Sequence, residues 1–262
     1  MDIPLPPLLL AQLLPYLPAT ARVAGLIAAA PVFSSGLIPA PVRVSLALAF
    51  ALALGGLAPP LAAGGALPGG VYLGMLLAEV AVGLALGLAA RLLMESLTFA
   101  GQMLELQIGL HAGALFDPAS GQQTSQLGQL YQLAGMLLFL ELGGHHWLLH
   151  AVAASFQAAP PGQIAISPNL LPLIAGLGTC VFRLALQVAA PIAFVLFLVD
   201  LAFGVIGRTV PQMNVFAVEI PAKLAVGLVA MIVCTPLLLG VMSSLLGDMR
   251  VVLEGMLRAL SG

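Results

Sequence analysis

Two histidines in the middle of the chain have the spacing of a metal site. His146 and His150 lie four residues apart, so on a helix they would share one face, as zinc ligands often do. No HExxH motif surrounds them, and no cysteine or third ligand completes a site in the sequence. Histidines beside Trp147 at a membrane–water interface explain the same pattern more simply. The sequence therefore predicts neither a metal nor a cofactor.

Motifs for other kinds of catalysis are missing from the sequence. Lys223 is the single lysine and no glycine-rich loop precedes it, so there is no nucleotide-binding P-loop. No GxSxG motif, no Cys/His pair and no pair of acids occurs at catalytic spacing. Cys180 and Cys234 lie in apolar stretches, where a small buried side chain is the expected role. We therefore expect the protein not to be an enzyme.

The composition predicts an integral membrane protein. The 262 residues are 61% hydrophobic and 7% charged, with a mean hydropathy of +1.13, whereas soluble domains are roughly 25% charged. A net charge of -2 leaves no basic stripe, which excludes nucleic acid as a plausible partner. Runs such as 44–54 lack the alternation of membrane β-strands, so the predicted class is all-α.

Six apolar segments are candidates for membrane helices, each near or above the roughly 20 residues that cross a bilayer. Three of them exceed a simple span and are interrupted by charge, glycine or proline, which predicts tilted or broken helices packed against protein. The first is expected to be retained, because Asp2 stands where a signal peptide would be basic. The segments are 8–30, 41–63, 71–100, 127–157, 170–207 and 215–246.

Basic residues in short loops predict the orientation in the membrane. Arg43 follows the first segment, and Arg208 and Lys223 flank the turn between the fifth and sixth. The loops after the second and fourth segments contain no Lys or Arg. This pattern favours termini on the non-cytoplasmic side and a cytoplasmic turn, although Arg250 and Arg258 near the C-terminus favour the reverse.

Charged and small residues within the apolar segments predict close helix packing. Arg22 lies in the first segment, where it either snorkels to an interface or makes a buried contact with another subunit. Glu79, Gly83 and Gly87 have a spacing of four on one helix face, and Arg91 continues the series. Small residues at this spacing allow two helix backbones to approach, so packing is favoured over a proton relay through Glu79.

A stretch rich in amides and glycines, residues 109–126, separates two apolar segments. It is too long for a tight hairpin, and it lacks Lys and Arg while keeping apolar residues. An ordinary surface loop is one interpretation. Non-helical backbone at membrane depth is tolerated where it lines a cavity, so we interpret the stretch as a pore-facing element. Its candidate residues are Gly109, Gly113, Leu115, Phe116, Asp117 and Pro118.

The turn before the last apolar segment is polar. Glu219 and Lys223 are four residues apart there and can neutralise each other if the segment is helical despite Pro221. The turn residues singled out beside Lys223 are Gln212, Asn214 and Phe216.

Taken in order, these motifs resemble the FliR/SctT family of the type III secretion export apparatus. They span most of the chain, and the LFDPASGQQ segment with GGHHWLL downstream is more similar to the flagellar branch. Glu219 departs from the small or apolar residue expected at its position. The matching pieces are 22–33 with 39–43, Glu79 with Gly83 and Gly87, 107–118, Gly144 with His145, and 211–216.

The resemblance implies a non-catalytic subunit of the export gate through which unfolded proteins cross the bacterial inner membrane, at the flagellar basal body or the injectisome base. It implies assembly with homologues of FliP, FliQ, FlhB and FlhA into a helical complex. Residues 1–165 would be similar to FliP and 166–262 to FliQ, and 109–126 would be the pore plug. The alternative is a secondary transporter for a small solute or ion, with Glu79, Arg91 and Asp200 as charges at the membrane midplane.

Overall fold

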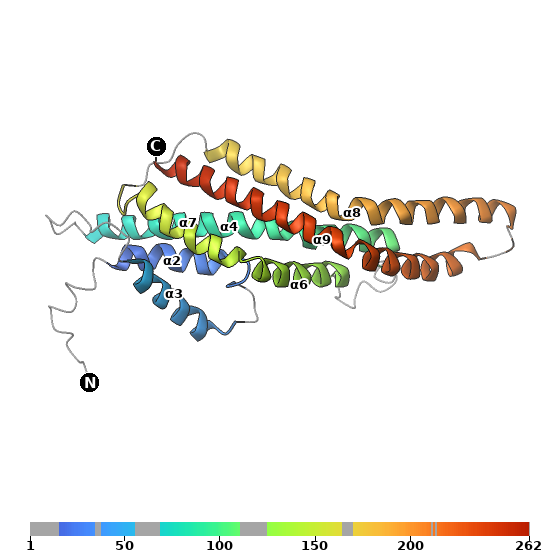
Figure 1. Cartoon of the computed structure of the whole chain (residues 1–262), viewed down its shortest axis with the longest axis horizontal. Coiled ribbons are helices and arrows are strands. Elements are labelled where there is room, and N and C mark those ends of the chain that lie inside the picture. Colours follow the sequence, from blue (N-terminus) through green and yellow to red (C-terminus); the bar gives the residue numbers. More distant parts are fainter. Residues whose placement is uncertain are drawn as a thin grey trace. The chain divides into compact units, whose positions relative to one another are not determined.

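The computed structural model describes residues 16–34, 38–55, 69–110, 125–163, 170–210, 212 and 214–261. In this part of the chain the elements are helices, so the predicted all-α class is confirmed. Their bounds are α2 (Leu17–Ala29), α3 (Ala40–Gly55), α4 (Gly69–Ile108), α6 (Gln126–Glu141), α7 (Gly144–Ala158), α8 (Leu170–Thr209) and α9 (Val215–Ser261) (Figure 1).

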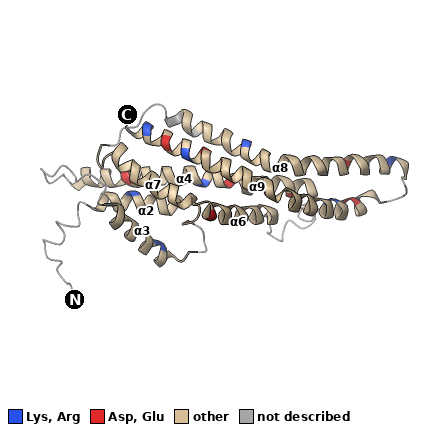
Figure 2. Ribbon diagram, in the orientation of Figure 1, with Lys and Arg blue, Asp and Glu red and all other residues tan. Residues whose placement is uncertain are grey.

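Three of these helices, α4, α8 and α9, are long and apolar enough to cross a membrane. Charged residues are sparse along them (Figure 2). Prolines lie inside two of the three, Pro191 in α8 and both Pro221 and Pro236 in α9. A proline lacks the N–H that a helix needs, so each leaves a carbonyl without its usual partner. Both helices nevertheless continue through their prolines, so the expected breaks are not seen in them.

The helix boundaries differ from the predicted segments. α4 ends at residue 108 rather than 100, because the polar residues after 100 are good helix formers and do not stop the helix. α9 ends at 261 rather than 246. The segment 127–157 is two helices, because Gly143 takes a left-handed conformation with φ of 72° between α6 and α7.

The first two predicted segments are described only in part. Residues 8–15 and 56–63 lie outside the described residues. The helices that are described there, α2 with 13 residues and α3 with 16, are each shorter than a full membrane span of about 20 residues.

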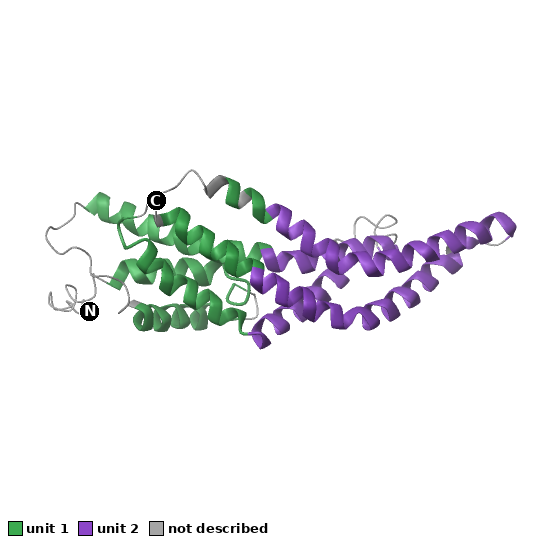
Figure 3. Ribbon diagram, turned by 45° about the horizontal axis from the view of Figure 1, so that its top comes forward, with its two compact units in different colours: residues 1–92, 143–177, 248–262 green, residues 93–142, 178–247 purple. Residues whose placement is uncertain are grey.

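The chain forms two compact units, each made of separate stretches of sequence (Figure 3). Unit 1 consists of residues 1–92, 143–177 and 248–262, and unit 2 consists of 93–142 and 178–247. The predicted division at residue 165 concerns similarity to other proteins and stays a prediction.

In unit 1, α2 and α4 are in backbone contact through glycines. A Cβ atom added to Gly83 would clash with the carbonyl oxygen of Arg22, and one added to Gly87 would lie 2.8 Å from the carbonyl oxygen of Leu26. Gly25 makes the corresponding contact from α2 to the backbone of α4. The two helices can therefore approach this closely only because these three positions carry no side chain.

In unit 2, a similar glycine contact joins α4 to α6. A Cβ atom on Gly101 would lie 2.7 Å from the backbone nitrogen of Gly128. The side chain of Gln107 connects α4 to α8 by donating a hydrogen bond of 2.9 Å from Nε2 to the carbonyl oxygen of Ala193. Each unit thus has its own helix contacts, and together these position the polar groups described next.

We expect Gly83→Ala to destabilise the protein, because the added methyl group meets a backbone carbonyl that cannot move aside. Overpacking of this kind costs about 1–3 kcal/mol. Gly74→Ala is the matched control, since this glycine lies on the same helix with nothing within 4 Å of an added Cβ. The measurement is the steady-state amount in membranes together with the thermal aggregation temperature in mild detergent. Equal behaviour of the two variants would show that the contact does not constrain the helices.

Candidate functional site

Arg22 is fully buried in unit 1, and its guanidinium group has an acceptor for each N–H. Nε donates to Oε2 of Glu79 at 2.7 Å, and Nη2 lies 2.6 Å from the same oxygen. Nη1 donates to the carbonyl oxygen of Ser155 at 2.8 Å and to its Oγ at 3.0 Å, and Nη2 donates to the carbonyl oxygen of Ala159 at 2.8 Å. The ring of Phe156 lies 4.7 Å from the guanidinium carbon.

Glu79 is equally buried and bonds to more than Arg22. Its Oε1 accepts a hydrogen bond of 3.2 Å from the backbone N–H of Gly162. Ser155 and Ala159 belong to the C-terminal end of α7, where a positive charge is favourable because it faces the negative end of the helix dipole. The ion pair therefore connects α2, α4, α7 and the turn after α7.

This geometry decides how Arg22 is accommodated. Its side chain does not snorkel to an interface, and the buried contact lies within the chain rather than toward another subunit. Glu79 is neutralised by a cation at 2.6 Å. Removing one member of a buried pair of this kind usually costs about 3–5 kcal/mol, because the other charge stays buried without compensation.

Arg91 does not share the environment of the other residues in its series. Glu79, Gly83 and Gly87 are buried, whereas Arg91 is exposed. Four residues make slightly more than one helical turn, so each step of four rotates by about 40° around the helix. Three such steps move Arg91 away from the buried face. Its assignment to a contact with another subunit stays a prediction.

The two ends of the polar stretch 109–126 are joined by a buried carboxylate. Glu105 accepts a hydrogen bond from Oγ of Ser125 and one of 3.2 Å from the N–H of Leu127. Oγ of Ser125 also accepts from the N–H of Gly128 at 2.9 Å, as the N-cap of α6. We call this group the stem. It consists of Glu105, Ser125 and the backbone groups to which they bond. The carboxylate lies at the N-terminus of α6, where a negative charge is favourable.

Of the predicted pore residues, Gly109 lies within the described part of the chain. It follows α4 with φ of 84°, and its N–H bonds to the carbonyl oxygen of Glu105 at 3.2 Å, an arrangement in which glycine commonly ends a helix. The other predicted pore residues lie outside the described residues, namely Gly113, Leu115, Phe116, Asp117 and Pro118.

At the polar turn, Lys223 has two partners. Its Nζ lies 2.8 Å from Oε1 of Glu219 within α9, which remains helical through Pro221, and 2.5 Å from Oδ1 of Asp200 in α8. The sequence indicated the first partner but not the second, which lies on another helix. Of the remaining turn residues, Gln212 and Asn214 are exposed. Phe216 lies in the first turn of α9, and the side of the membrane that the turn faces stays a prediction.

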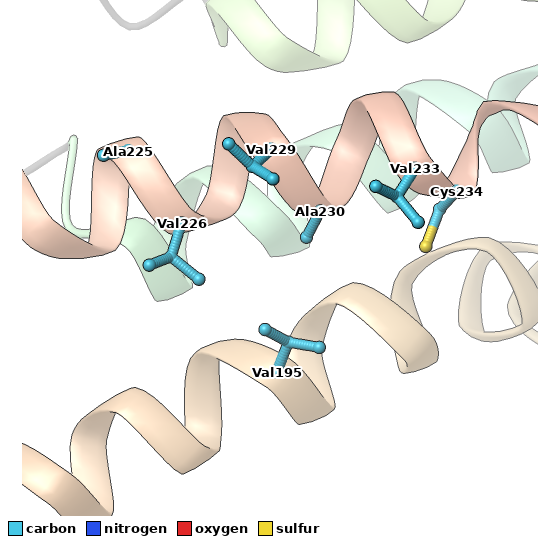
Figure 4. Close-up of a pocket in the computed structure, with 7 residues that line it drawn as sticks. All are labelled: Val195, Ala225, Val226, Val229, Ala230, Val233 and Cys234. Atoms are coloured by element: carbon cyan, nitrogen blue, oxygen red, sulfur yellow. The ribbon is translucent and has the colours of Figure 1, made fainter.

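A wholly apolar groove lies between α8 and α9 in unit 2 (Figure 4). It has a volume of about 440 Å³ and contains no charged group, so it suits a lipid chain or an apolar helix rather than a polar substrate. Its lining residues are Val195, Ala225, Val226, Val229, Ala230, Val233 and Cys234.

Within the described residues, no three His, Cys, Asp or Glu side chains come together to hold a metal ion. The rings of His145 and His146 lie 4.0 Å apart. Trp147 contacts a cation instead, the guanidinium group of Arg250, at 4.8 Å from the ring centre.

The polar residues that the sequence analysis missed gave weak signals. Ser125 stands before an apolar run, which is the position of an N-cap and could have indicated its role. Ser155 is a single hydroxyl in a buried helix face. The carbonyl oxygen of Ala159 and the N–H of Gly162 are backbone groups, and they have no signature in residue type.

We expect Arg22→Leu and Glu79→Leu each to lower the amount and the thermal stability of the protein strongly, by about 3–5 kcal/mol for the loss of Arg22. The double variant Arg22→Leu with Glu79→Leu should recover part of that loss, since it leaves no buried charge. Glu254→Gln is the control, because it breaks an exposed pair worth about 0.2–1 kcal/mol. The check is thermal unfolding in detergent. Additive effects of the two single changes would contradict a direct coupling.

Comparison with known proteins shows which family the chain is similar to. The family described as bacterial export proteins, family 1, matches residues 13–249. The flagellar biosynthetic protein FliR of Bacillus subtilis is 39% identical over 61% of this chain and 64% of its own length. FliR of Escherichia coli is 30% identical over 83% of this chain and 82% of its own. The secretion system apparatus protein SsaT of Salmonella typhimurium is 27% identical over 63% of this chain and 64% of its own. This chain therefore belongs to the bacterial export protein family 1, the FliR/SctT family.

Proposed function

We propose that this chain is a non-catalytic subunit of the type III protein export gate, of the flagellar type, in the bacterial inner membrane. The observation that carries the proposal is the match of residues 13–249 to the export protein family, together with relatives named flagellar biosynthetic protein FliR. In this role the chain helps to form and seal the channel for unfolded flagellar proteins. The energy comes from the proton motive force and from a separate ATPase.

The surface of unit 2 supports assembly with other gate subunits. Large apolar side chains are exposed on α8 and α9, among them Phe194 (62%), Val205 (63%) and Ile232 (73%). Apolar surface of this extent usually marks contact with lipid or with another protein. The groove between α8 and α9 continues this character. We propose that homologues of FliP, FliQ, FlhB and FlhA are the protein partners, with residues 1–165 similar to FliP and 166–262 similar to FliQ.

The arrangement of charges favours a gate over a secondary transporter. A transporter needs ionisable groups in the membrane that can bind and release its cargo. Glu79 is paired with Arg22 and bonded to the backbone of Gly162, and Asp200 is paired with Lys223. These carboxylates are engaged in bracing helices, which suits a rigid channel wall.

The stem supports a plug in residues 109–126. A segment that blocks a channel must be anchored at both ends, because a segment with a free end would not stay at one position in the channel. Glu105 and Ser125 supply such a fixed base from α4 and α6. Phe116 would provide bulk at the constriction, and Gly109, Gly113 and Gly121 would let the backbone fold and later move aside.

Deletion of the gene for this chain in its own host should abolish secretion of flagellar rod, hook and filament proteins, while general secretion and solute uptake stay intact. The measurement is the amount of flagellin in the culture medium, with a plasmid copy of the gene as the control. Uptake defects with normal flagellin export would instead support the transporter.

Purification of a tagged copy should recover FliP and FliQ homologues, and recovery of the chain as a lone, monodisperse monomer would argue against an obligate complex.

Removing residues 110–120 should leave assembly intact and raise leakage of ions or small solutes across the membrane, because the stem is retained while the obstruction is lost. Phe116→Ala should give a weaker leak. Leakage can be followed by the membrane potential of cells that make the complex, and Leu130→Ala, an exposed site on α6, is the control. If the complex with the deletion assembles and the membrane leaks no more than with the wild-type complex, the segment is not the plug.

A further inference from the structure

Unit 1 contains a second group of polar side chains, between α7 and α9, that takes no part in the Arg22 ion pair. It consists of Trp147, His150, Arg250 and Glu254, which we call the Trp147 cluster. Nε of Arg250 donates to Oε1 of Glu254 at 2.9 Å, and its guanidinium carbon lies 4.8 Å from the centre of the Trp147 ring. The Arg250 and Glu254 side chains are 58% and 50% exposed, so both charges are available to a ligand.

The cluster surrounds a cavity of about 180 Å³. The share of one water molecule in the liquid is about 30 Å³, so the cavity can take a group of several heavy atoms. Apolar residues of both helices form the rest of its wall, including Ala151, Leu253 and Leu257. The site therefore combines a rim that carries one positive and one negative charge with an apolar floor.

The surroundings of the cluster indicate a membrane surface. Arg250 and Glu254 lie toward the C-terminal end of α9, a helix that contains a stretch apolar enough to cross a bilayer, and Val251 beside them is 69% exposed. Two exposed charges are costly in the hydrocarbon core but favourable among lipid headgroups. Tryptophan is enriched at that same level. A ligand that meets this site is thus most simply a lipid.

We propose that the Trp147 cluster binds the headgroup of phosphatidylethanolamine. The phosphate would accept hydrogen bonds from the guanidinium group of Arg250 and from the imidazole of His150, and the primary ammonium group would donate to the carboxylate of Glu254. One acyl chain would cover the apolar floor. The opposite charges of Arg250 and Glu254, four residues apart on one helix, match a headgroup that carries both charges.

The chemistry distinguishes this lipid from its common alternatives. Phosphatidylglycerol lacks the ammonium group, so it would leave Glu254 facing an anion. The quaternary ammonium group of phosphatidylcholine has no N–H to donate. The proposal needs only the membrane location of the chain and does not depend on its role in export.

Trp147 provides the probe, because it is the single tryptophan of the chain. The protein, purified together with any subunits that accompany it from the host membrane, would be placed in lipid nanodiscs, and its fluorescence compared with that of the same preparation carrying Trp147→Phe, so that the difference reports on Trp147. Lipids with brominated acyl chains quench a tryptophan that they contact. Brominated phosphatidylethanolamine should quench Trp147 with about tenfold higher apparent affinity than brominated phosphatidylcholine or phosphatidylglycerol, as expected for one hydrogen bond to a charged group.

Arg250→Gln and Glu254→Gln should each abolish this preference without affecting assembly, since both side chains are exposed. Arg183→Gln, an exposed arginine on α8, should leave the preference unchanged. Three outcomes would overturn the proposal: equal quenching by all three lipids, which indicates ordinary bilayer contact; a preference for phosphatidylglycerol, which indicates a simple anion site; and no quenching by any lipid, which indicates that another subunit covers the cluster.

Discussion

The buried ion pair between Arg22 and Glu79 is the interaction on which unit 1 depends. A buried arginine in an apolar helix is tolerated only if its charge and its N–H groups are all engaged. Here a carboxylate from α4 and the last carbonyls of α7 together provide the acceptors. Three helices that are far apart in the sequence are thereby tied to one side chain. Lysine could not replace it, because a single ammonium group lacks the planar fork that reaches all of them.

The ion pair and the glycine contacts act together, because both involve Arg22. Its carbonyl oxygen lies against Gly83, and its side chain reaches Glu79 one turn earlier on the same helix. A wider separation between α2 and α4 would lengthen the bond to the carboxylate. Without the carboxylate of Glu79, the closely packed helices α2 and α4 would bury the charge of Arg22 with no counter-charge. In unit 2, Glu105 has a comparable role on a smaller scale, since it bonds to the first turn of α6.

The sequence was informative where spacing along one helix determined the outcome, and uninformative where partners came from distant segments. Glu79, Gly83 and Gly87 could be placed on one face because they are separated by about one turn each. The partner of Glu79 could not be identified, because it lies 57 residues away and no periodicity connects the two helices. The same holds for Asp200, which pairs with Lys223 from another helix. The break at Gly143 was missed because a left-handed glycine inside an apolar run resembles a packing glycine.

The distance along the chain between Arg22 and its last partners affects how the protein is made. Ser155 follows Arg22 by 133 residues. A ribosome adds roughly 5–20 residues per second, so α2 exists for about 7–27 s before α7 has been synthesised. During that time its arginine has an incomplete set of acceptors, and a charge at the bilayer centre costs about 2.5–3.5 kcal/mol on insertion scales. Arg22 therefore gains its full set of acceptors only after α7 has been made, although α2 is the first described helix of the chain.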